Sequence, residues 1–179
     1  MGGVTFGDIL FIVFICGVIY VIMSLVHRSQ RDNDDQKDQH AVAVNDDVSL
    51  RAILEETASI AIVGASNNPE RPSHQVMAYL QNAGYKIYPV TPSAGIIHGQ
   101  QTYATLADLP EPPDVVEVFR RSDAVPDIAR AAVACKAKVL WLQEGVISDE
   151  GLKIAGAGGL KVVMDRCMEK EYRRLVKEQ

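Results

Sequence analysis

The chain has 179 residues and a formal net charge of −5. This length suits about one domain, at roughly 100–200 residues per domain. The negative balance argues against nucleic acid as a partner. The three cysteines, Cys16, Cys135 and Cys167, form no CxxC pair. Neither a zinc site nor a disulfide framework is therefore predicted, and a reducing compartment fits best.

The N-terminal part of the chain predicts a membrane anchor. After a short start at residues 1–8, residues 9–26 contain no charged side chain. As a helix this run would span about 27 Å, close to the roughly 30 Å hydrocarbon core of a bilayer. A secretory signal peptide needs a basic segment before the apolar run, and Asp8 is the only charged side chain there. We therefore expect a single-pass transmembrane helix at 9–26.

The residues that follow predict its orientation. His27, Arg28 and Arg31 come directly after the apolar run, and the positive-inside rule then places the C-terminal domain in the cytosol. Residues 27–47 are polar and acidic. They contain too little apolar surface to order themselves, so this segment is interpreted as a flexible acidic tether.

Residues 48–179 alternate between strand-like and helix-like patterns. Short, nearly continuous apolar runs are typical of strands that are covered on both faces. The expected strands are 59–63, 86–90, 115–119, 138–142 and 161–164, and the expected helices are 49–57, 73–82, 124–134, 149–155 and 169–177. Such alternation predicts right-handed crossovers and a Rossmann-like, doubly wound α/β domain with a mainly parallel five-stranded sheet. Its ligand would lie at the C-terminal ends of the strands.

The loop after the first expected strand favours a phosphate-bearing ligand. It runs from Gly64 to the start of a helix and contains Ser66, Arg71 and Ser73. The hydroxyls can donate hydrogen bonds, and Arg71 can form a bidentate pair with a phosphate. Ser73, after Pro72, is predicted to be the N-cap, and the first N–H groups of that helix would add donors and a favourable dipole. The alternative is that Ser73 only caps its helix and Arg71 only faces solvent.

The usual dinucleotides fit this loop poorly. From Gly64 the chain reads Gly-Ala-Ser-Asn-Asn-Pro, which lacks the second and third glycines of GxGxxG. The second strand ends in Tyr88-Pro-Val-Thr-Pro92, without the Asp or Glu that would hold a ribose. Both departures count against NAD and FAD.

Motifs at several strand ends, in order, carry a resemblance to a known family. They are Gly64-Ala-Ser66, Arg71-Pro-Ser73, Tyr88-Pro-Val-Thr-Pro92, Tyr103 with Leu106-Ala-Asp-Leu-Pro110, Val115-Val-Glu-Val-Phe-Arg120, Trp141-Leu-Gln-Glu-Gly145 and Val163-Met-Asp-Arg-Cys-Met168. Over about residues 50–176 the chain resembles the small stand-alone CoA-binding domain proteins. These are similar to the N-terminal domain of the succinyl-CoA synthetase alpha subunit.

The resemblance implies a domain that binds coenzyme A, with acyl-CoA as a further ligand. It implies three groups of binding residues. Gly64, Ser66, Asn67, Arg71 and Ser73 would serve the phosphate end; Val90, Thr91 and Pro92 would lie along the adenosine; Phe119, Arg120, Leu142, Gln143 and Glu144 would line the far side. The synthetase-type domain has a lysine after the second strand, which Pro92-Ser-Ala-Gly-Ile96 lacks. Arg71 or Arg121 would supply that charge instead.

The sequence favours a binding module over an enzyme. The four histidines form no Ser-His-Asp order and no HExxH motif. Relatives often continue Cys-x-x-x-Glu-His, where this chain has Cys167-Met-Glu-Lys-Glu-Tyr172, so no histidine role carries over. Three alternatives stay open: an NAD(P)-dependent oxidoreductase, suggested by topology alone; a CoA-dependent transferase that uses Cys167; and a scaffold domain that binds no small molecule. The sequence leaves the oligomeric state undetermined.

Overall fold

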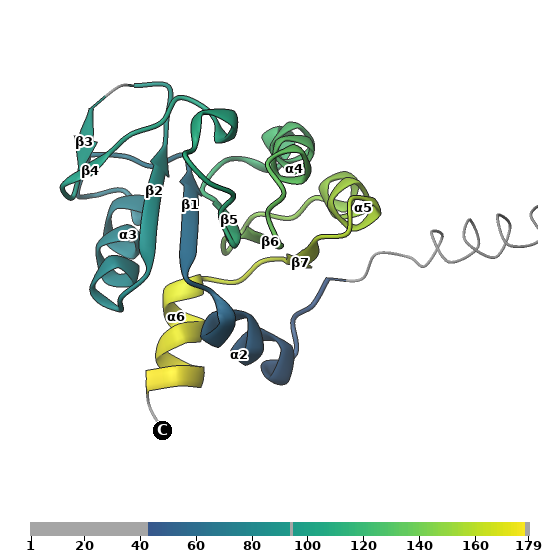
Figure 1. Ribbon diagram of the computed structural model, residues 1–179. Coiled ribbons are helices and arrows are strands. Elements are labelled where there is room, and N and C mark those ends of the chain that lie inside the picture. The colour runs from purple at the N-terminus through teal and green to yellow at the C-terminus, as the bar shows by residue number, and fades with distance from the viewer. Residues whose placement is uncertain (1–42, 94, 178–179) are drawn as a thin grey trace, which may run out of the picture. The chain divides into compact units, whose positions relative to one another are not determined.

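A five-stranded parallel sheet forms the centre of the domain in the computed structural model, which describes residues 43–93 and 95–177 (Figure 1). The strands are β1 (Ser59–Val63), β2 (Lys86–Val90), β5 (Val115–Val118), β6 (Val139–Leu142) and β7 (Lys161–Val163). Their order in the sheet is β2-β1-β5-β6-β7, and every neighbouring pair is parallel. The predicted α/β class and strand number are confirmed.

Helices cover both faces of this sheet, as expected for a doubly wound fold (Figure 1). One face carries α2 (Asp47–Glu56), α3 (Pro72–Asn82) and α6 (Met168–Tyr172), which continues into the π-helical η3 (Arg173–Lys177). The other face carries α4 (Val125–Ala134) and α5 (Asp149–Ala157). Each strand between the layers is therefore buried on both sides.

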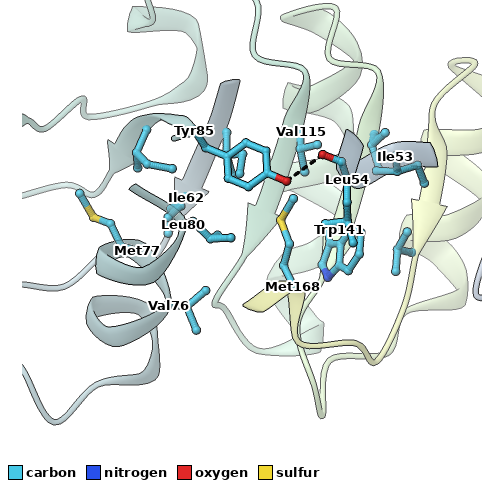
Figure 2. Close-up of a cluster of buried hydrophobic side chains, with 14 of the residues drawn as sticks. Ile53, Leu54, Ile62, Val76, Met77, Leu80, Tyr85, Val115, Trp141 and Met168 are labelled. Atoms are coloured by element: carbon cyan, nitrogen blue, oxygen red, sulfur yellow. Dashed lines mark hydrogen bonds between the residues drawn. The ribbon is translucent and has the colours of Figure 1, made fainter. Parts of the chain in front are cut away.

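The larger core lies under α2, α3 and α6 (Figure 2). Alternation along β1 directs Ile60 and Ile62 to this face, where Trp141 of β6 is fully buried. The Tyr85 hydroxyl donates to the Leu54 carbonyl oxygen over 2.7 Å, which links α2 to the start of β2. Trp141 fills the core, and its indole N–H donates to the Arg166 carbonyl oxygen over 2.8 Å.

Several short elements were not predicted. A hairpin of two-residue strands, β3 (Ile96–Ile97) and β4 (Gln100–Gln101), follows β2. The 3-10 turns η1 (Leu106–Asp108) and η2 (Ser122–Ala124) precede β5 and α4. The last helix, expected to be uniform over 169–177, changes from α-helical to π-helical at Arg173.

The predicted tether at 27–47 extends too far toward the domain. The Val44 N–H donates to the Val162 carbonyl oxygen over 2.7 Å. The Asn45 amide donates to the Met164 carbonyl oxygen over 2.9 Å and accepts from the Met164 N–H over 3.2 Å. These bonds attach the segment before α2 to the edge strand β7, so residues 43–47 belong to the folded domain. Residues 27–42 lie outside the described residues.

The predicted anchor at 9–26 and the start at 1–8 also lie outside the described residues. Within 43–93 and 95–177, no helix is long and apolar enough to cross a bilayer.

Candidate functional site

The sheet places a candidate site where its strand order reverses. The connection after β1 leads to β2 on one side, and the connection after β5 leads to β6 on the other side, so the loops after β1 and β5 diverge at the C-terminal edge. In open parallel sheets, ligands bind in the crevice that this reversal creates. Gly64 ends β1 with a φ of +92°, and an added Cβ would lie 2.6 Å from the Phe119 carbonyl oxygen after β5. Only glycine allows the two loops to approach this closely.

A groove of about 880 Å³ opens at this edge. Its lining comes from four segments: the β1–α3 loop with the start of α3, the loop after β5, the loop after β6, and the start of α6. The lining residues are Gly64, Ser66, Arg71, Pro72, Ser73, Gln75, Val76, Phe119, Arg120, Arg121, Gln143, Glu144, Gly145, Val146, Cys167, Glu169 and Lys170. Four of these, Arg71, Arg120, Arg121 and Lys170, are cationic and exposed.

The amino end of α3 faces the groove without a side-chain cap. The predicted N-cap, Ser73, is wrong: the N-cap is Arg71, Pro72 is the first helical residue, and no side chain caps the helix. Proline prefers this first position because its missing N–H would have no intrahelical partner anyway. Ser73 is instead 4 % exposed inside the first turn. The His74 N–H donates to the Arg71 carbonyl oxygen over 3.0 Å, so the uncapped Ser73 N–H and the helix dipole are what favour an anion at this end.

Local hydrogen bonds hold the loop between Gly64 and α3 in shape. The Asn68 N–H donates to the Ser66 hydroxyl over 3.2 Å, and the Glu70 N–H donates to the Asn68 side-chain oxygen over 2.9 Å. The Gly64 N–H donates to the Val90 carbonyl oxygen over 3.0 Å. The loop is thus pre-formed by its own polar groups, which reduces the ordering cost of binding a ligand.

The opposite wall is formed by the loop after β6 and by α6. Lys170 and Glu144 form an ion pair over 2.5 Å, with their side chains 66 % and 60 % exposed. A pair this exposed contributes little to stability, so Lys170 is available to a more highly charged partner. The Gly145 N–H donates to the Asp165 carboxylate over 2.6 Å, which joins the loops after β6 and β7.

The structure brings together eight of the predicted site residues: Gly64, Ser66, Arg71, Ser73, Phe119, Arg120, Gln143 and Glu144 all line the groove. Asn67 is exposed on the same loop, and Thr91 and Pro92 follow β2 at the neighbouring strand end. Val90 is buried, and its carbonyl oxygen holds the Gly64 loop. The Leu142 side chain is fully buried in the core under α4 and α5. It therefore does not reach the groove.

Sequence reasoning missed Lys170 as a groove residue. The sequence does not show that Lys170 faces the groove, because it lies on α6, far along the chain from the other loops that line the groove. Within Cys167–Tyr172 the informative residue is Lys170, in the first turn of a helix that follows a strand end. This lysine adds a cation to the groove, whereas the loop after β2 contains none.

Cys167 lines the groove, and Cys135 lies at the end of α4 against the second core. Burial raises the pKa of the Cys167 thiol, and the negative charges of Glu117 and Glu169 act in the same direction. A neutral thiol is a weak nucleophile, which counts against the transferase alternative. Within the part of the chain that the structure describes, no three His, Cys, Asp or Glu side chains gather as a metal site.

Glu117 is the unexpected residue of this region. It lies on β5, is 0 % exposed, and accepts a hydrogen bond from the Gln143 amide. Its second carboxylate oxygen is buried without a hydrogen-bond partner. Burial raises the pKa of Glu117 to about 8, because a charged carboxylate loses its hydration there.

A glycine at the strand-order reversal, an uncapped helix and a cationic groove are together typical of α/β domains of the Rossmann-like class. Residues 58–173 match the CoA binding domain family. The chain belongs to this family.

The chain is similar to three known proteins in particular. YneT of Bacillus subtilis (strain 168), an uncharacterised protein, is 36% identical over 120 residues, which cover 67% of this chain and 89% of YneT. A solved hypothetical protein from Pyrococcus horikoshii OT3 is 37% identical with a TM-score of 0.71, covering 73% of this chain and 92% of that one. The ADP-forming acetate–CoA ligase II of Archaeoglobus fulgidus is 28% identical over 97 residues, 53% of this chain but 14% of the ligase.

Proposed function

We propose that this chain is a coenzyme A-binding module, with acyl-CoA as a further ligand, tethered to a membrane by residues 9–26. The observation that carries the proposal is the groove at the strand-order reversal. It combines an uncapped helix end with the cationic side chains of Arg71, Arg120, Arg121 and Lys170. This is a donor set for the phosphates of a nucleotide.

The residues present fit coenzyme A in charge and in size. The Gly64 loop and the first turn of α3 would hold phosphate oxygens through N–H groups, with Arg71 as a bidentate partner. The groove volume of about 880 Å³ lies within the usual range for cofactor sites, roughly 300–1,000 Å³. Phe119 and Val146 add apolar lining, which suits the uncharged arm of the cofactor.

Two further features support binding of CoA in preference to NAD(P). The ligase of Archaeoglobus fulgidus is named for a reaction with CoA, and the aligned region is a small part of that enzyme. The segment after β2 is Thr91-Pro92, which offers no carboxylate to a ribose. Cys167 lines the groove and can therefore contact a ligand. Because its thiol pKa is raised, it is not a thiolate nucleophile.

Thermal unfolding of the full-length chain in detergent tests the proposal. CoA at 100 times its dissociation constant should stabilise the domain by about 2.7 kcal/mol, whereas NAD and NADP at equal concentrations should not. Arg71→Ala should weaken CoA binding about tenfold, by the loss of a charge-assisted pair of roughly 1.5 kcal/mol. Arg51→Ala on α2, outside the groove, should bind as the parent does. A folded sample with no response to CoA or acetyl-CoA would refute the proposal.

A further inference from the structure

Glu117 raises a problem of hydrogen bonding beneath the groove. Its carboxyl group lies within the sheet, one oxygen bonded to the Gln143 amide and the other buried without a partner. Leaving a buried polar atom unpaired costs about 1–3 kcal/mol. An apolar residue at this β5 position would avoid that cost. The presence of a carboxyl group here therefore needs an explanation, and its hydrogen bond to Gln143 suggests one.

Gln143 connects Glu117 to the ligand site. It is 6 % exposed, follows β6, and lines the groove. A primary amide has a carbonyl oxygen that accepts and an NH₂ group that donates, and the two diverge from one carbon. When one of them is committed to Glu117, the other is left for the groove. The protonation state of Glu117 decides which one that is.

An ionised Glu117 accepts only, so it requires the NH₂ group of Gln143 and leaves the amide oxygen for the groove. A protonated Glu117 carries an O–H that must find an acceptor, and the amide oxygen of Gln143 supplies one after the amide rotates by half a turn. The NH₂ group then faces the groove. Rotation gives this O–H an acceptor, which removes the cost of leaving a buried donor unpaired.

We propose that Glu117 sets which hydrogen-bonding atom Gln143 presents to the ligand, an acceptor when Glu117 is ionised and a donor when it is protonated. This inference rests on the proposed function, because it assigns the Gln143 side of the groove to the amide, thioester or thiol groups of a CoA-type ligand. Glu117 touches no ligand itself and is a positioning residue. Its buried state gives a midpoint of about 8 for the change.

The titratable groups around Glu117 do not oppose its protonation. Cys167 and Glu169, at the start of α6, are the titratable groups that interact with it electrostatically, and the negative charge of Glu169 favours the protonated form. The core cluster on this face contains apolar residues of α2 and α3 such as Leu54 and Met77. Tyr85 belongs to the same cluster, and burial raises the pKa of its hydroxyl, which therefore stays neutral over this pH range.

The inference predicts ligand preference as a function of pH. Below pH 8 the donor faces the groove and favours the thioester carbonyl of acetyl-CoA; above pH 8 the acceptor faces it and favours the thiol of CoA. Calorimetry with the full-length chain in detergent should show the acetyl-CoA to CoA affinity ratio falling about threefold to tenfold between pH 6.5 and 9, the range of one hydrogen bond. In Glu117→Gln and in Gln143→Met, the acetyl-CoA to CoA affinity ratio should stay constant between pH 6.5 and 9. Glu55→Gln, exposed on α2, should behave as the parent.

A ligand-free measurement separates this inference from the proposed function. In ¹⁵N spectra of the full-length chain, the Gln143 side-chain amide signals should titrate with the same midpoint as the ¹³C signal of the Glu117 carboxyl, and should not titrate in Glu117→Gln. Gln143 signals that stay constant from pH 6.5 to 9, or equal affinity ratios in parent and Glu117→Gln, would overturn it. Failure of CoA to bind at any pH would refute the proposed function, and the spectra alone would then decide the role of Glu117.

Discussion

Single residues determine how closely the loops of the groove approach. At Gly64 two constraints coincide: a φ of +92°, and a Phe119 carbonyl oxygen 2.6 Å from where a Cβ would lie. The first alone costs a non-glycine residue roughly 1–3 kcal/mol. The second requires the loop after β5, which carries Arg120, to move away. Stability and ligand geometry thus depend on the same position.

We expect Gly64→Ala to lower the free energy of unfolding by about 3–5 kcal/mol, the backbone cost plus that of displacing backbone atoms. Urea denaturation measures this. Gly84→Ala is the matched control, because Gly84 has a φ of +101° but no atom within 4 Å of an added Cβ. The control should lose only about 1–3 kcal/mol. Equal losses in the two variants would show that the approach to Phe119 costs nothing.

The buried carboxyl of Glu117 predicts a pH dependence of stability. Its pKa rises from 4.5 in the unfolded chain to about 8 in the folded one. Between these values the folded state binds more protons, so stability falls as pH rises from about 4.5 to 8 and then levels off. Glu117→Gln removes this slope, and the variant should gain on the parent by a few kcal/mol between pH 5 and pH 9. Denaturation midpoints in urea at pH 5, 7 and 9 test this. Glu55→Gln should follow the parent curve.

At the scale of elements, the segment before α2 behaves as an addition to the sheet. Val44 and Asn45 bond to β7, which would otherwise be an exposed edge. Edge strands left open invite pairing with other chains. The anchoring of this segment therefore protects the edge and fixes where the folded domain begins.

Asn45→Ala removes both bonds to Met164 and should destabilise the domain by about 1–3 kcal/mol. Hydrogen exchange should show loss of protection at the Met164 amide, with the amides of β1 unchanged. Asn82→Ala, exposed at the end of α3, is the matched control and should change stability by less than about 0.5 kcal/mol. Retained protection at Met164 in Asn45→Ala would show that the backbone of Val44 holds the segment unaided.

The elements that sequence patterns predicted are those with long apolar repeats. β1 and β2 match their expected bounds, since four consecutive buried residues in each strand leave little choice of register. The β3–β4 hairpin was missed because two-residue strands have no periodicity, although His98-Gly99, both at positive φ, is a turn signal. Ser73 was predicted to be the N-cap because serine is common at that position. Pro72, however, prefers the first helical position, and this makes Arg71 the N-cap.

The site was predictable only in part, for a similar reason. Residues at strand ends, such as Ser66 and Gln143, could be placed because parallel strands end at one edge. Lys170 could not, because the direction of α6 depends on packing. Glu117 interrupts an apolar run in β5, and that interruption was the available signal of a buried carboxyl group. Its pairing with Gln143 required the register of β5 and β6.

At the scale of the whole molecule, the proposed anchor at residues 9–26 would hold the ligand-binding groove at a membrane. If residues 9–26 span the bilayer, the full chain should remain with membranes after a high-salt wash, and a chain of residues 43–179 should stay in the supernatant and still bind CoA. Both should be scored by fractionation and calorimetry. A shortened chain that sediments with membranes as fully as the parent would contradict the proposed anchor.

Point substitutions test the anchor without shortening the chain. Ile15→Lys with Ile19→Lys places two charges near the centre of the apolar run, each costing about 2.5–3.5 kcal/mol on insertion scales. This variant should leave the membrane fraction and keep its affinity for CoA, since the groove draws on residues from 64 to 170. The matched control puts the same charges in the tether, as Gln36→Lys with Gln39→Lys, and should stay membrane-bound. Loss of both variants from the membrane would contradict the proposal, because the effect of the charges would then not be specific to residues 9–26.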